Sequence, residues 1–541
     1  MSDNTPQPAA APTEPGKTPR PGRTVAVIDI GATSIRMKIA QIGEQGDITV
    51  LESLRRGVPL GKDTFTKGRI QQSTIRECVD ILKGFRQVME EYGVTQPDQV
   101  QAIATSSVRE AENRDTFLDR VYISTGIGVR AIDEAEQNRL TYTAAQSVME
   151  YEPLLKSGEA LVVDVGGGST ELLLLQNGQV TYSNSYRLGS VRMRETLETH
   201  RAPTERVRTI LGQHISRLVE QMARSVPSTK PALLVAMSGD ARFAAAQLCA
   251  DWATVPAARM DYKTLSALVE RLLPLTVDKL VTKYRISYQE AETVGPGLLV
   301  YIHLLRAFKI DQLLIPKASI RDGLLKEMSL RGYWTPSFAE QVVHSASTLM
   351  RKYQVDEKHA RHVADLCVRL FRELQPEHKL DARHELLLEV AALIHEVGGF
   401  ISSRSHHKHS LYLILNSDLF GLTRHDTTMI ALVARYHRRA LPSPTHEEYM
   451  ALDRDSRIAV SKLAAILRVA DALDRNHVQQ VGDLTFSREP DQFVISVRGI
   501  DDLTMERLAM KEKGNLFQEV YGIPVVLRES RAPGGEAPDA R

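Results

Sequence analysis

Two acidic residues that each precede a glycine turn and hydroxyl side chains are the clearest candidates for chemistry in this sequence. Asp29 opens the segment DIGATS, and Asp164 opens the segment DVGGGSTE. Glycine lets backbone N–H groups approach an anion closely, hydroxyl groups add donors, and a carboxylate can hold a cation. One such turn joins many hairpins for geometric reasons alone. Two of them predict a pair of phosphate-binding loops that face each other across a cleft.

The second loop carries more glycine than a simple turn needs. Three successive glycines begin at Gly166. They lose so much chain entropy on folding that an anion cradle explains them better than a bare turn. The predicted phosphate-binding residues of the two loops are Gly31, Thr33, Ser34, Gly166, Gly167, Gly168, Ser169 and Thr170.

Three carboxylates in these loops are suited to a divalent cation. Asp29 and Asp164 end buried strands, and Glu171 begins the strand that leaves the second loop. Hard oxygen ligands of this kind favour Mg²⁺, or Mn²⁺, bridging to phosphate oxygens. The sequence therefore predicts a metal site at these three residues, and Glu171 is also a catalytic candidate.

The elements around the loops indicate a mixed α/β fold with two similar halves. Residues 24–40 and 159–176 each show two apolar runs interrupted by glycine, which is typical of a hairpin inside a buried sheet. Amphipathic helices are expected around residues 73–92 and 136–150, with a strand at VQAIATSS between them. This order predicts duplicated lobes.

The second half of the chain has a different pattern. From about Gly332 the strand patterns stop, and residues 337–477 show the apolar periodicity of helices. After Val481 an alternating pattern returns and predicts a small α/β unit. Because 541 residues exceed what one core usually serves, several domains are expected. The predicted division is a disordered tail (1–23), lobe I (24–144), lobe II (145–331), a helical domain (332–478), a small C-terminal α/β domain (479–530) and a second disordered tail (531–541).

Bulk composition narrows the partners and the compartment. The formal net charge is only +1, so no global charge favours nucleic acid or an anionic membrane. Cys78, Cys249 and Cys367 follow no ligand spacing and are interpreted as reduced thiols. No secretory signal and no apolar run of about 20 residues is present. We therefore expect a cytoplasmic protein that binds neither nucleic acid nor a membrane.

The helical region contains histidine and acidic residues in a metal-binding order. His359, the pair His395-Glu396 and Asp471 follow one another as His, His-Asp and Asp do in HD phosphohydrolases, which use them to hold divalent metals. Here the longer Glu396 replaces the central aspartate and displaces its carboxylate. We therefore interpret these four residues as structural packing in an HD-like domain.

A set of spaced motifs resembles the exopolyphosphatase/guanosine-pentaphosphate phosphohydrolase (Ppx/GppA) family. The motifs are VIDIGATSIRMKIA, IATSSVREAEN, IDEAEQNRLTY, VVDVGGGSTELLLL, YRLGSVRMRE and ASIRDGLL. Their order and spacing agree from Thr24 to Glu327, and the helical region with its appendix continues the match. The resemblance implies an α/β fold class: a duplicated actin-like, ribonuclease-H-like two-lobed module, an all-α HD-like domain and a small α/β C-terminal unit.

The same resemblance implies a function. It implies Mg²⁺-dependent release of terminal phosphate from polyphosphate, or of the 5′ γ-phosphate from guanosine pentaphosphate, by a homodimer. The two glycine loops match the family's phosphate loops. Arg109 matches a basic residue that faces the phosphates, and Arg321-Asp322-Gly323 matches the segment that closes the module.

One position departs from the family pattern. Family members usually have two consecutive glutamates before Ala-Arg, and the second acts as base for the attacking water. This chain has Glu136-Gln137-Asn138-Arg139, and Gln137 cannot accept a proton at neutral pH. Loss of a general base typically costs about 10²- to 10⁴-fold in rate. Glu136 or Glu134 could replace it, the enzyme could be slow, or the site could only bind phosphates.

Two basic segments of the helical region suggest where a long polyanion would run. They predict a polyphosphate channel, and their residues are His406, His407, Lys408, His409, Arg435, Arg438 and Arg439. A transition-metal cluster at the three histidines is an alternative. The channel favours polyphosphate over guanosine pentaphosphate or tetraphosphate as the ligand. A non-catalytic sensor of these phosphates is the alternative from another functional class.

Overall fold

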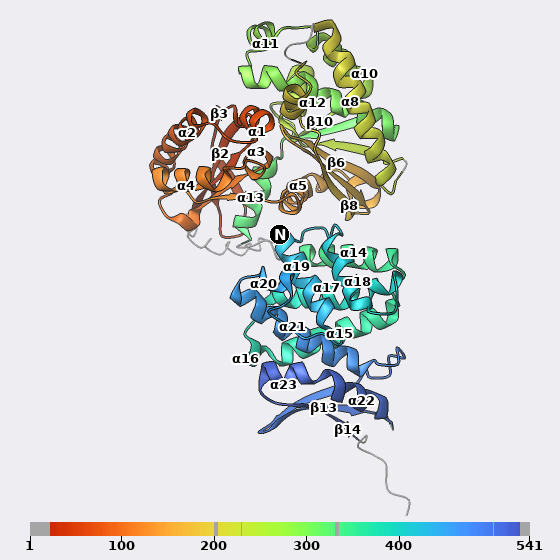
Figure 1. The fold of residues 1–541 in the computed structure, drawn as a ribbon. Coiled ribbons are helices and arrows are strands. Elements are labelled where there is room, and N and C mark those ends of the chain that lie inside the picture. Colours follow the sequence, from red (N-terminus) through yellow and green to blue (C-terminus); the bar gives the residue numbers. More distant parts are fainter. Residues whose placement is uncertain (1–21, 200–203, 229, 331–334, 501, 531–541) are drawn as a thin grey trace, which may run out of the picture.

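The computed structural model describes residues 22–199, 204–228, 230–330, 335–500 and 502–530. Two α/β lobes lie side by side, the helical domain lies below them, and a small sheet forms the far end of the molecule (Figure 1). The predicted tail 531–541 and all but the last two residues of the predicted tail 1–23 lie outside the described residues. The predicted boundary at residues 331–332 does so as well.

Lobe I is built on a five-stranded sheet with the order β3-β2-β1-β4-β5. Its strands are β1 (Arg23–Ile30), β2 (Ser34–Ile42), β3 (Ile48–Gly57), β4 (Val100–Ala104) and β5 (Val129–Ala131). Its helices are α1 (Leu60–Lys67), α2 (Gln72–Glu91), α3 (Ser106–Arg109) and α4 (Arg114–Thr125). Alternate residues of β1 face opposite sides: Ala26 and Ile28 pack with α2 and α4, while Val25 and Val27 face the other side. A sheet buried on both faces explains the continuous apolar run of residues 25–28 in β1.

Lobe II repeats the central pattern in a six-stranded sheet with the order β10-β11-β9-β6-β7-β8. In both lobes the first strand pairs antiparallel with the second and parallel with a later strand: β1 with β2 and β4, and β6 with β7 and β9. The strands are β6 (Glu159–Val165), β7 (Thr170–Gln176), β8 (Gln179–Tyr186), β9 (Leu233–Ala236), β10 (Ala257–Asp261) and β11 (Gln312–Pro316). The helices are α6 (Leu154–Ser157), α7 (Ser190–Thr196), α8 (Thr204–Ser225), α9 (Gly239–Leu248), α10 (Tyr262–Leu272), α11 (Val277–Tyr284) and α12 (Tyr288–Phe308). The duplicated-lobe prediction agrees with this topology.

Two helices cross between the lobes, so the predicted boundaries need correction. The predicted division at residues 144/145 falls inside α5 (Glu134–Met149), which is a single helix. The segment predicted to end lobe II forms α13 (Ile320–Ser329), which returns to lobe I and packs against β1, β2 and α5. A Cβ added to Gly323 would lie 2.5 Å from the carbonyl oxygen of Leu140, so the two helices touch through glycine. The apolar stripe of a helix does not reveal which of two sheets it covers. The sequence therefore could not show that α5 and α13 cross the predicted boundaries.

The helical domain consists of helices throughout the part of residues 337–477 that the structure describes, as predicted. Its elements are α14 (Pro336–Lys352), α15 (Glu357–Glu373), α16 (Gln375–His378), α17 (Ala382–Ile394), a 3₁₀ turn (Val397–Phe400), α18 (His406–Leu415), α19 (Arg424–Tyr436), α20 (Glu447–Met450) and α21 (Arg454–Leu473). This domain shares its core with α5 and one face of the lobe II sheet. Tyr142 meets Phe420 edge to face at 5.4 Å, and the side-chain oxygen of Gln341 accepts a hydrogen bond from the Val180 N–H.

The C-terminal unit is a three-stranded sheet with the order β12-β13-β14, which agrees with the predicted α/β appendix. Its elements are β12 (Leu484–Glu489), β13 (Gln492–Arg498), α22 (Thr504–Lys513), α23 (Asn515–Tyr521) and β14 (Val525–Ser530). Because β13 and β14 run parallel, a crossover is required, and α22 and α23 supply it. Both helices pack on α21. Within the described residues, no helix is long and apolar enough to cross a membrane.

Candidate functional site

The two glycine loops meet at a cleft between the lobes. Both loops join an antiparallel strand pair, so the hairpin geometry that the sequence predicts puts them at equivalent places in the two sheets. Predicted residues that line this cleft are Asp29, Gly31, Thr33, Ser34, Gln137, Asp164, Gly166, Gly167, Ser169 and Glu171. Thr170 does not line it, because this side chain is buried and its hydroxyl donates to the Leu188 carbonyl.

The loops of the two lobes are in direct contact, and glycine makes this possible. A Cβ added to Gly167 would lie 2.6 Å from the Cβ of Ala32 in the opposite loop. A Cβ added to Gly168 would collide with Ser106 and would lie 2.5 Å from the Phe65 ring. Ser106 and Phe65 both belong to lobe I. Gly168 therefore contributes to closure of the lobes and not to the cleft surface.

Gly168→Ala is expected to lower the free energy of unfolding by about 1–3 kcal/mol, because overpacking forces well-packed neighbours apart. The same change is expected to weaken phosphate binding by separating the loops. Urea unfolding and titration with polyphosphate measure the two effects. Gly84→Ala is the matched control: Gly84 is exposed within α2 and an added Cβ meets nothing within 4 Å. That control is expected to be stabilising by about 0.5–1 kcal/mol. Equal effects of the two substitutions would contradict the closure role.

Two of the predicted metal ligands face each other across a single strand pair. Asp164 and Glu171 are directly opposite in the β6–β7 ladder. Burial, with Asp164 nearby, raises the pKa of Glu171 to about 7. Burial also raises the pKa of Asp164, although Arg242 opposes the shift. Both carboxyls thus lack enough positive charge to stabilise their ionised forms fully.

The donor set fits a bound Mg²⁺. Glu171 accepts hydrogen bonds from Ser169 (2.6 Å) and Ser185 (3.2 Å) on Oε1. Its buried Oε2 has no hydrogen-bond partner among the described residues. Mg²⁺ is usually held by one or two carboxylates together with substrate phosphates and water. A cation held by Glu171 Oε2 and Asp164, with Asp29 on the facing loop, would give Oε2 a partner. Its positive charge would also stabilise the ionised forms of both carboxyls and so lower their raised pKa values.

Four arginines surround the cleft, and the sequence predicted none of them there, since Arg321 was expected only in the segment that closes the module. Arg36, Arg55 and Arg242 join Arg321 in lining it. Burial, followed by the neighbouring Arg36, lowers the pKa of Arg321 to about 10 and that of Arg55 to about 9. The positive charges of these neighbouring arginines repel one another, and a bound anion would relieve that repulsion. Arginine is also well suited to bidentate phosphate binding. The signal for Arg36 was its place in β2, two residues after Ser34, whose Oγ accepts from its Nε at 3.0 Å.

Asp240 also lines the cleft, at the start of α9. Burial raises its pKa to about 6, against the lowering influence of Arg36 and Arg55. Within the cleft this carboxyl is thus partly neutralised by the arginines. A carboxylate beside bound phosphate would be unfavourable by itself, and Arg36 and Arg55 compensate its charge.

Gln137 lines the cleft, whereas its neighbour Glu136 does not. Gln137 accepts a hydrogen bond on Oε1 from Arg109 Nη1 at 3.2 Å. Glu136 is turned to Arg130 (2.9 Å) and Arg139 (3.4 Å). The prediction that Glu136 could take over as base is therefore wrong for this conformation, because successive residues of a helix point about 100° apart.

Arg109 and Glu134 lie behind Gln137. They line a neighbouring cavity with Asp133 and Asn138 and do not reach the cleft. Besides Gln137, Arg109 donates to the Ile132 carbonyl at 3.0 Å. Its guanidinium holds the Gln137 amide, and its predicted role in phosphate binding stays a prediction.

The structure contradicts part of the predicted polyphosphate channel. His406 and His407 are buried, and His406 Nε2 lies 3.0 Å from His437 Nε2. Buried imidazoles cannot bind a polyanion along a surface. Lys408 and Arg439 are exposed. The remaining channel residues, His409, Arg435 and Arg438, are half-buried.

The histidine and acidic residues of the helical domain come together as their order suggested. His359, His395 and Asp471 place one ligand atom each within 4.8 Å of one another, and so do His359, Glu396 and His477. Among the described residues, no other three potential ligands meet this limit. Asp29, Asp164 and Glu171 in the cleft therefore lie farther apart than these two groups do.

The fold and the site together define a class: a two-lobed, actin-like α/β phosphate-handling protein. The profile of the Ppx/GppA phosphatase family matches residues 38–332. The profile of domain III of that family matches residues 343–502. Because the first match alone spans more than half of the chain, this chain belongs to the Ppx/GppA phosphatase family, as the resemblance implied.

Individual relatives agree with this assignment. A protein of Aeromonas hydrophila named guanosine-5′-triphosphate,3′-diphosphate pyrophosphatase is 25% identical over 452 residues, which cover 82% of this chain and 86% of that protein. Its namesake from Aeromonas salmonicida is 24% identical over 87% of this chain and 92% of that protein.

Solved structures match the two lobes. An exopolyphosphatase from Cytophaga hutchinsonii aligns with a TM-score of 0.52 at 21% identity, covering 57% of this chain and 99% of that one. An exopolyphosphatase-like protein aligns with a TM-score of 0.51 at 25% identity, covering 58% and 99%. These structures show the fold that the two lobes share with them, whereas the phosphatase description comes from the family profile.

Proposed function

We propose that this protein hydrolyses terminal phosphoanhydride bonds and releases orthophosphate from inorganic polyphosphate in a Mg²⁺-dependent reaction. The observation that carries the proposal is the composition of the cleft: two facing glycine loops, the Asp164–Glu171 pair and four arginines. The loops supply N–H and hydroxyl donors, the arginines neutralise phosphate oxygens, and the carboxylates hold the cation. Positioning and electrostatic stabilisation of this kind account for most of phosphoryl-transfer catalysis.

Guanosine pentaphosphate is the second candidate substrate. The names of the Aeromonas relatives favour it, and those proteins match this chain over most of its length. The burial of His406 and His407 also removes part of the argument for a polymer channel. Either substrate would present the same terminal phosphate to the cleft.

A phosphate-binding sensor is the alternative function, and Gln137 favours it. Glutamine can orient a water but cannot take its proton. Full occupancy of the cleft without turnover would then signal through lobe closure.

One experiment separates these possibilities. Untagged protein is incubated with long-chain polyphosphate or guanosine pentaphosphate, with Mg²⁺ or with EDTA, and orthophosphate release is followed beside calorimetric binding. Release from polyphosphate that EDTA abolishes supports the proposal. Release from guanosine pentaphosphate alone shifts it to the second substrate, and tight binding without release supports the sensor.

Two further features of the family resemblance stay proposals. We propose that the helical domain is HD-like, since α15, α17 and α21 bring the relevant residues together. We also propose a homodimer, which light scattering on the purified protein would test.

A further inference from the structure

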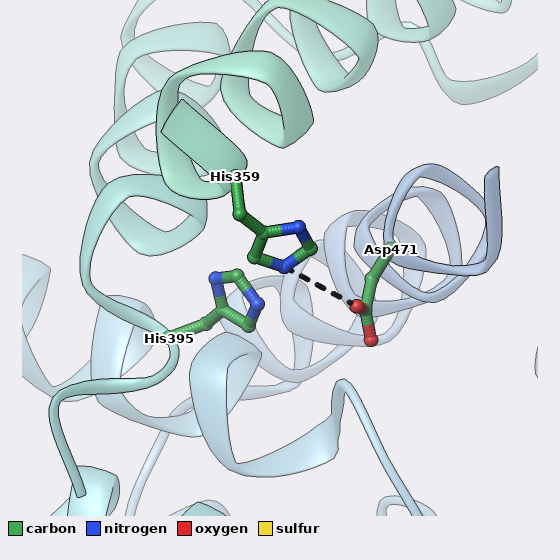
Figure 2. Close-up of side chains that lie close together, drawn as sticks. All are labelled: His359, His395 and Asp471. Carbon is green, nitrogen blue, oxygen red and sulfur yellow. Dashed lines mark ion pairs between the residues drawn. The ribbon is translucent and has the colours of Figure 1, made fainter. Parts of the chain in front are cut away.

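The histidine and aspartate side chains at the centre of the helical domain form a group that the proposed cleft chemistry does not use. His359 lies on α15, His395 follows the last residue of α17, and Asp471 lies on α21, so three helices converge there (Figure 2). Both imidazoles are fully buried and Asp471 is 5% exposed. Burial of this many polar groups is costly unless each one is paired.

The hydrogen bonds of the two imidazoles fix where their protons are. His395 Nδ1 lies 2.6 Å from the Ala392 carbonyl oxygen, which can only accept, so Nδ1 carries the proton. His359 Nδ1 lies 2.8 Å from Asp474 Oδ2, which is also an acceptor when ionised. In the neutral rings, therefore, both Nε2 atoms carry lone pairs.

Both Nε2 atoms lack a hydrogen-bond partner in the part of the chain that the structure describes. They are buried and point into the group, toward Asp471 (Figure 2). The Nδ1–H to carboxylate or carbonyl contact on the other side of each ring is the arrangement that orients metal-bound histidines.

Asp471 is divided between two partners. The Lys513 ammonium from α22 binds Oδ2, while Oδ1 lies 3.8 Å from His359 Nε2. Two ligand atoms on one tetrahedral Zn²⁺ are about 3.4 Å apart, given bonds of about 2.0–2.2 Å. The observed separation therefore needs only a small side-chain movement to accommodate a metal. Lys513 takes one oxygen and leaves the other facing the imidazoles.

Some other buried histidines of this domain have a hydrogen-bond partner on both ring nitrogens. His437 Nδ1 donates to the Ala434 carbonyl, and its Nε2 lies 3.0 Å from His406 Nε2, which can donate to it. His378 likewise has contacts on both nitrogens, with the Phe371 carbonyl and the Leu380 N–H. His362 Nε2 and His407 Nδ1 also lack a partner among the described residues, but His359 and His395 differ from them because their bare Nε2 atoms lie together beside the Asp471 carboxylate.

We propose that His359, His395 and Asp471 bind one first-row transition-metal dication, with Zn²⁺ the best match. Two imidazole nitrogens and one carboxylate oxygen suit Zn²⁺, Co²⁺ or Mn²⁺, whereas Mg²⁺ prefers oxygen ligands throughout. Glu396 is half-buried and belongs to a second group, with His359 and His477, that shares His359 with this one. The site is separate from the cleft between the lobes. A metal there ties α15, α17 and α21 together.

The competing explanation is an imidazolium in place of a metal. Burial opposes protonation of His359, yet the hydrogen bond to Asp474 and nearby carboxylates outweigh it and raise the pKa of this ring. Protonation would give His359 Nε2 a proton to share with Asp471. It would still leave His395 Nε2 bare, because burial lowers the pKa of that ring.

The test uses untagged, full-length protein stripped of metal and equilibrated with ZnCl₂ or CoCl₂ in an excess of Mg²⁺. We expect about one equivalent of metal by elemental analysis after gel filtration, visible absorption bands for Co²⁺, and a higher melting temperature with metal. His395→Gln and Asp471→Asn are expected to lose the bound metal. Asp474→Asn keeps all ligands and is expected to weaken Zn²⁺ binding about 10- to 100-fold, as loss of an orienting partner does.

Two controls exclude trivial outcomes. His378→Gln removes a buried histidine with both nitrogens in use, and His409→Gln removes a half-buried histidine of α18. Both are expected to keep the metal. If the wild-type protein retains no transition metal, or if the Asp474→Asn protein binds it as tightly as wild type, the proposal is wrong. The group is then an imidazolium–carboxylate network.

Discussion

Gln137→Glu is expected to raise the rate of phosphate release by about 10²- to 10⁴-fold, which is the contribution that general-base catalysis typically makes. Gln137 lines the cleft beside the glycine loops, so a carboxylate at this position would face the space where the phosphate is proposed to bind. The amide of Gln137 already accepts a hydrogen bond from Arg109 Nη1. A glutamate has the same shape and would accept that bond with an ionised oxygen, so the side chain is expected to keep its place.

The measurement is the single-turnover and steady-state release of orthophosphate from polyphosphate and from guanosine pentaphosphate. The matched control is Gln72→Glu, which introduces the same charge at the exposed first residue of α2 and is expected to leave the rate unchanged. A gain in Gln137→Glu with unchanged binding identifies Gln137 as the position of the missing base. An unchanged rate would show that the base lies elsewhere, or that proton transfer does not limit the reaction.

Much of the cleft could be predicted from the sequence because its chemistry is local. Each loop has an acidic residue, one or three glycines and hydroxyl side chains within eight consecutive residues, and the β1–β2 and β6–β7 hairpins place them without help from distant segments. The spacing of these residues therefore carries the prediction.

The arginines of the cleft could not be found in the same way. Arg55 is on β3, and Arg242 is on α9, far along the chain. Nothing in the neighbouring sequence distinguishes them from solvated arginines. Only the pairing of β2 with β3 and the position of α9 beside the second loop bring them to the phosphate loops.

The prediction that the basic segment of α18 lies on the surface was wrong for His406 and His407, because packing against the next helix buries them. Consecutive histidines near lysine and arginine resemble a solvated surface, but α18 packs on α19 and buries His406 and His407. Neutral histidine is readily buried when its nitrogens find partners, as His406 does with His437. Composition alone does not distinguish a buried imidazole from an exposed one.

Glu171→Gln is expected to lower phosphate release by at least about 10²-fold, because in the proposed reaction this negative charge holds the cation and assists the attacking water. The change keeps Oε1 as an acceptor for Ser169 and Ser185, so the local fold is preserved. If wild-type turnover is too slow to measure, the comparison is made in the Gln137→Glu background. A Mg²⁺ titration of the rate is expected to shift to higher concentration. Glu159→Gln, at the other end of the same hairpin, is expected to leave the Mg²⁺ requirement unchanged.

The same substitution is expected to stabilise the metal-free protein, which distinguishes a functional carboxylate from a structural one. Burial raises the pKa of Glu171 to about 7 in the folded state, above the value of 4.5 expected when unfolded. Between these two values the folded state keeps a proton that the unfolded state has lost. The stability contribution of Glu171 therefore falls as pH rises through this window and stays low above it.

At pH 8 in EDTA, Glu171→Gln should raise the free energy of unfolding by as much as about 3 kcal/mol, and at pH 4 by much less. Urea unfolding at the two pH values measures this difference. Destabilisation at pH 8 would show that Glu171 is held by structural partners. A gain in stability that Mg²⁺ removes would show that the cleft holds a strained carboxylate for its cation.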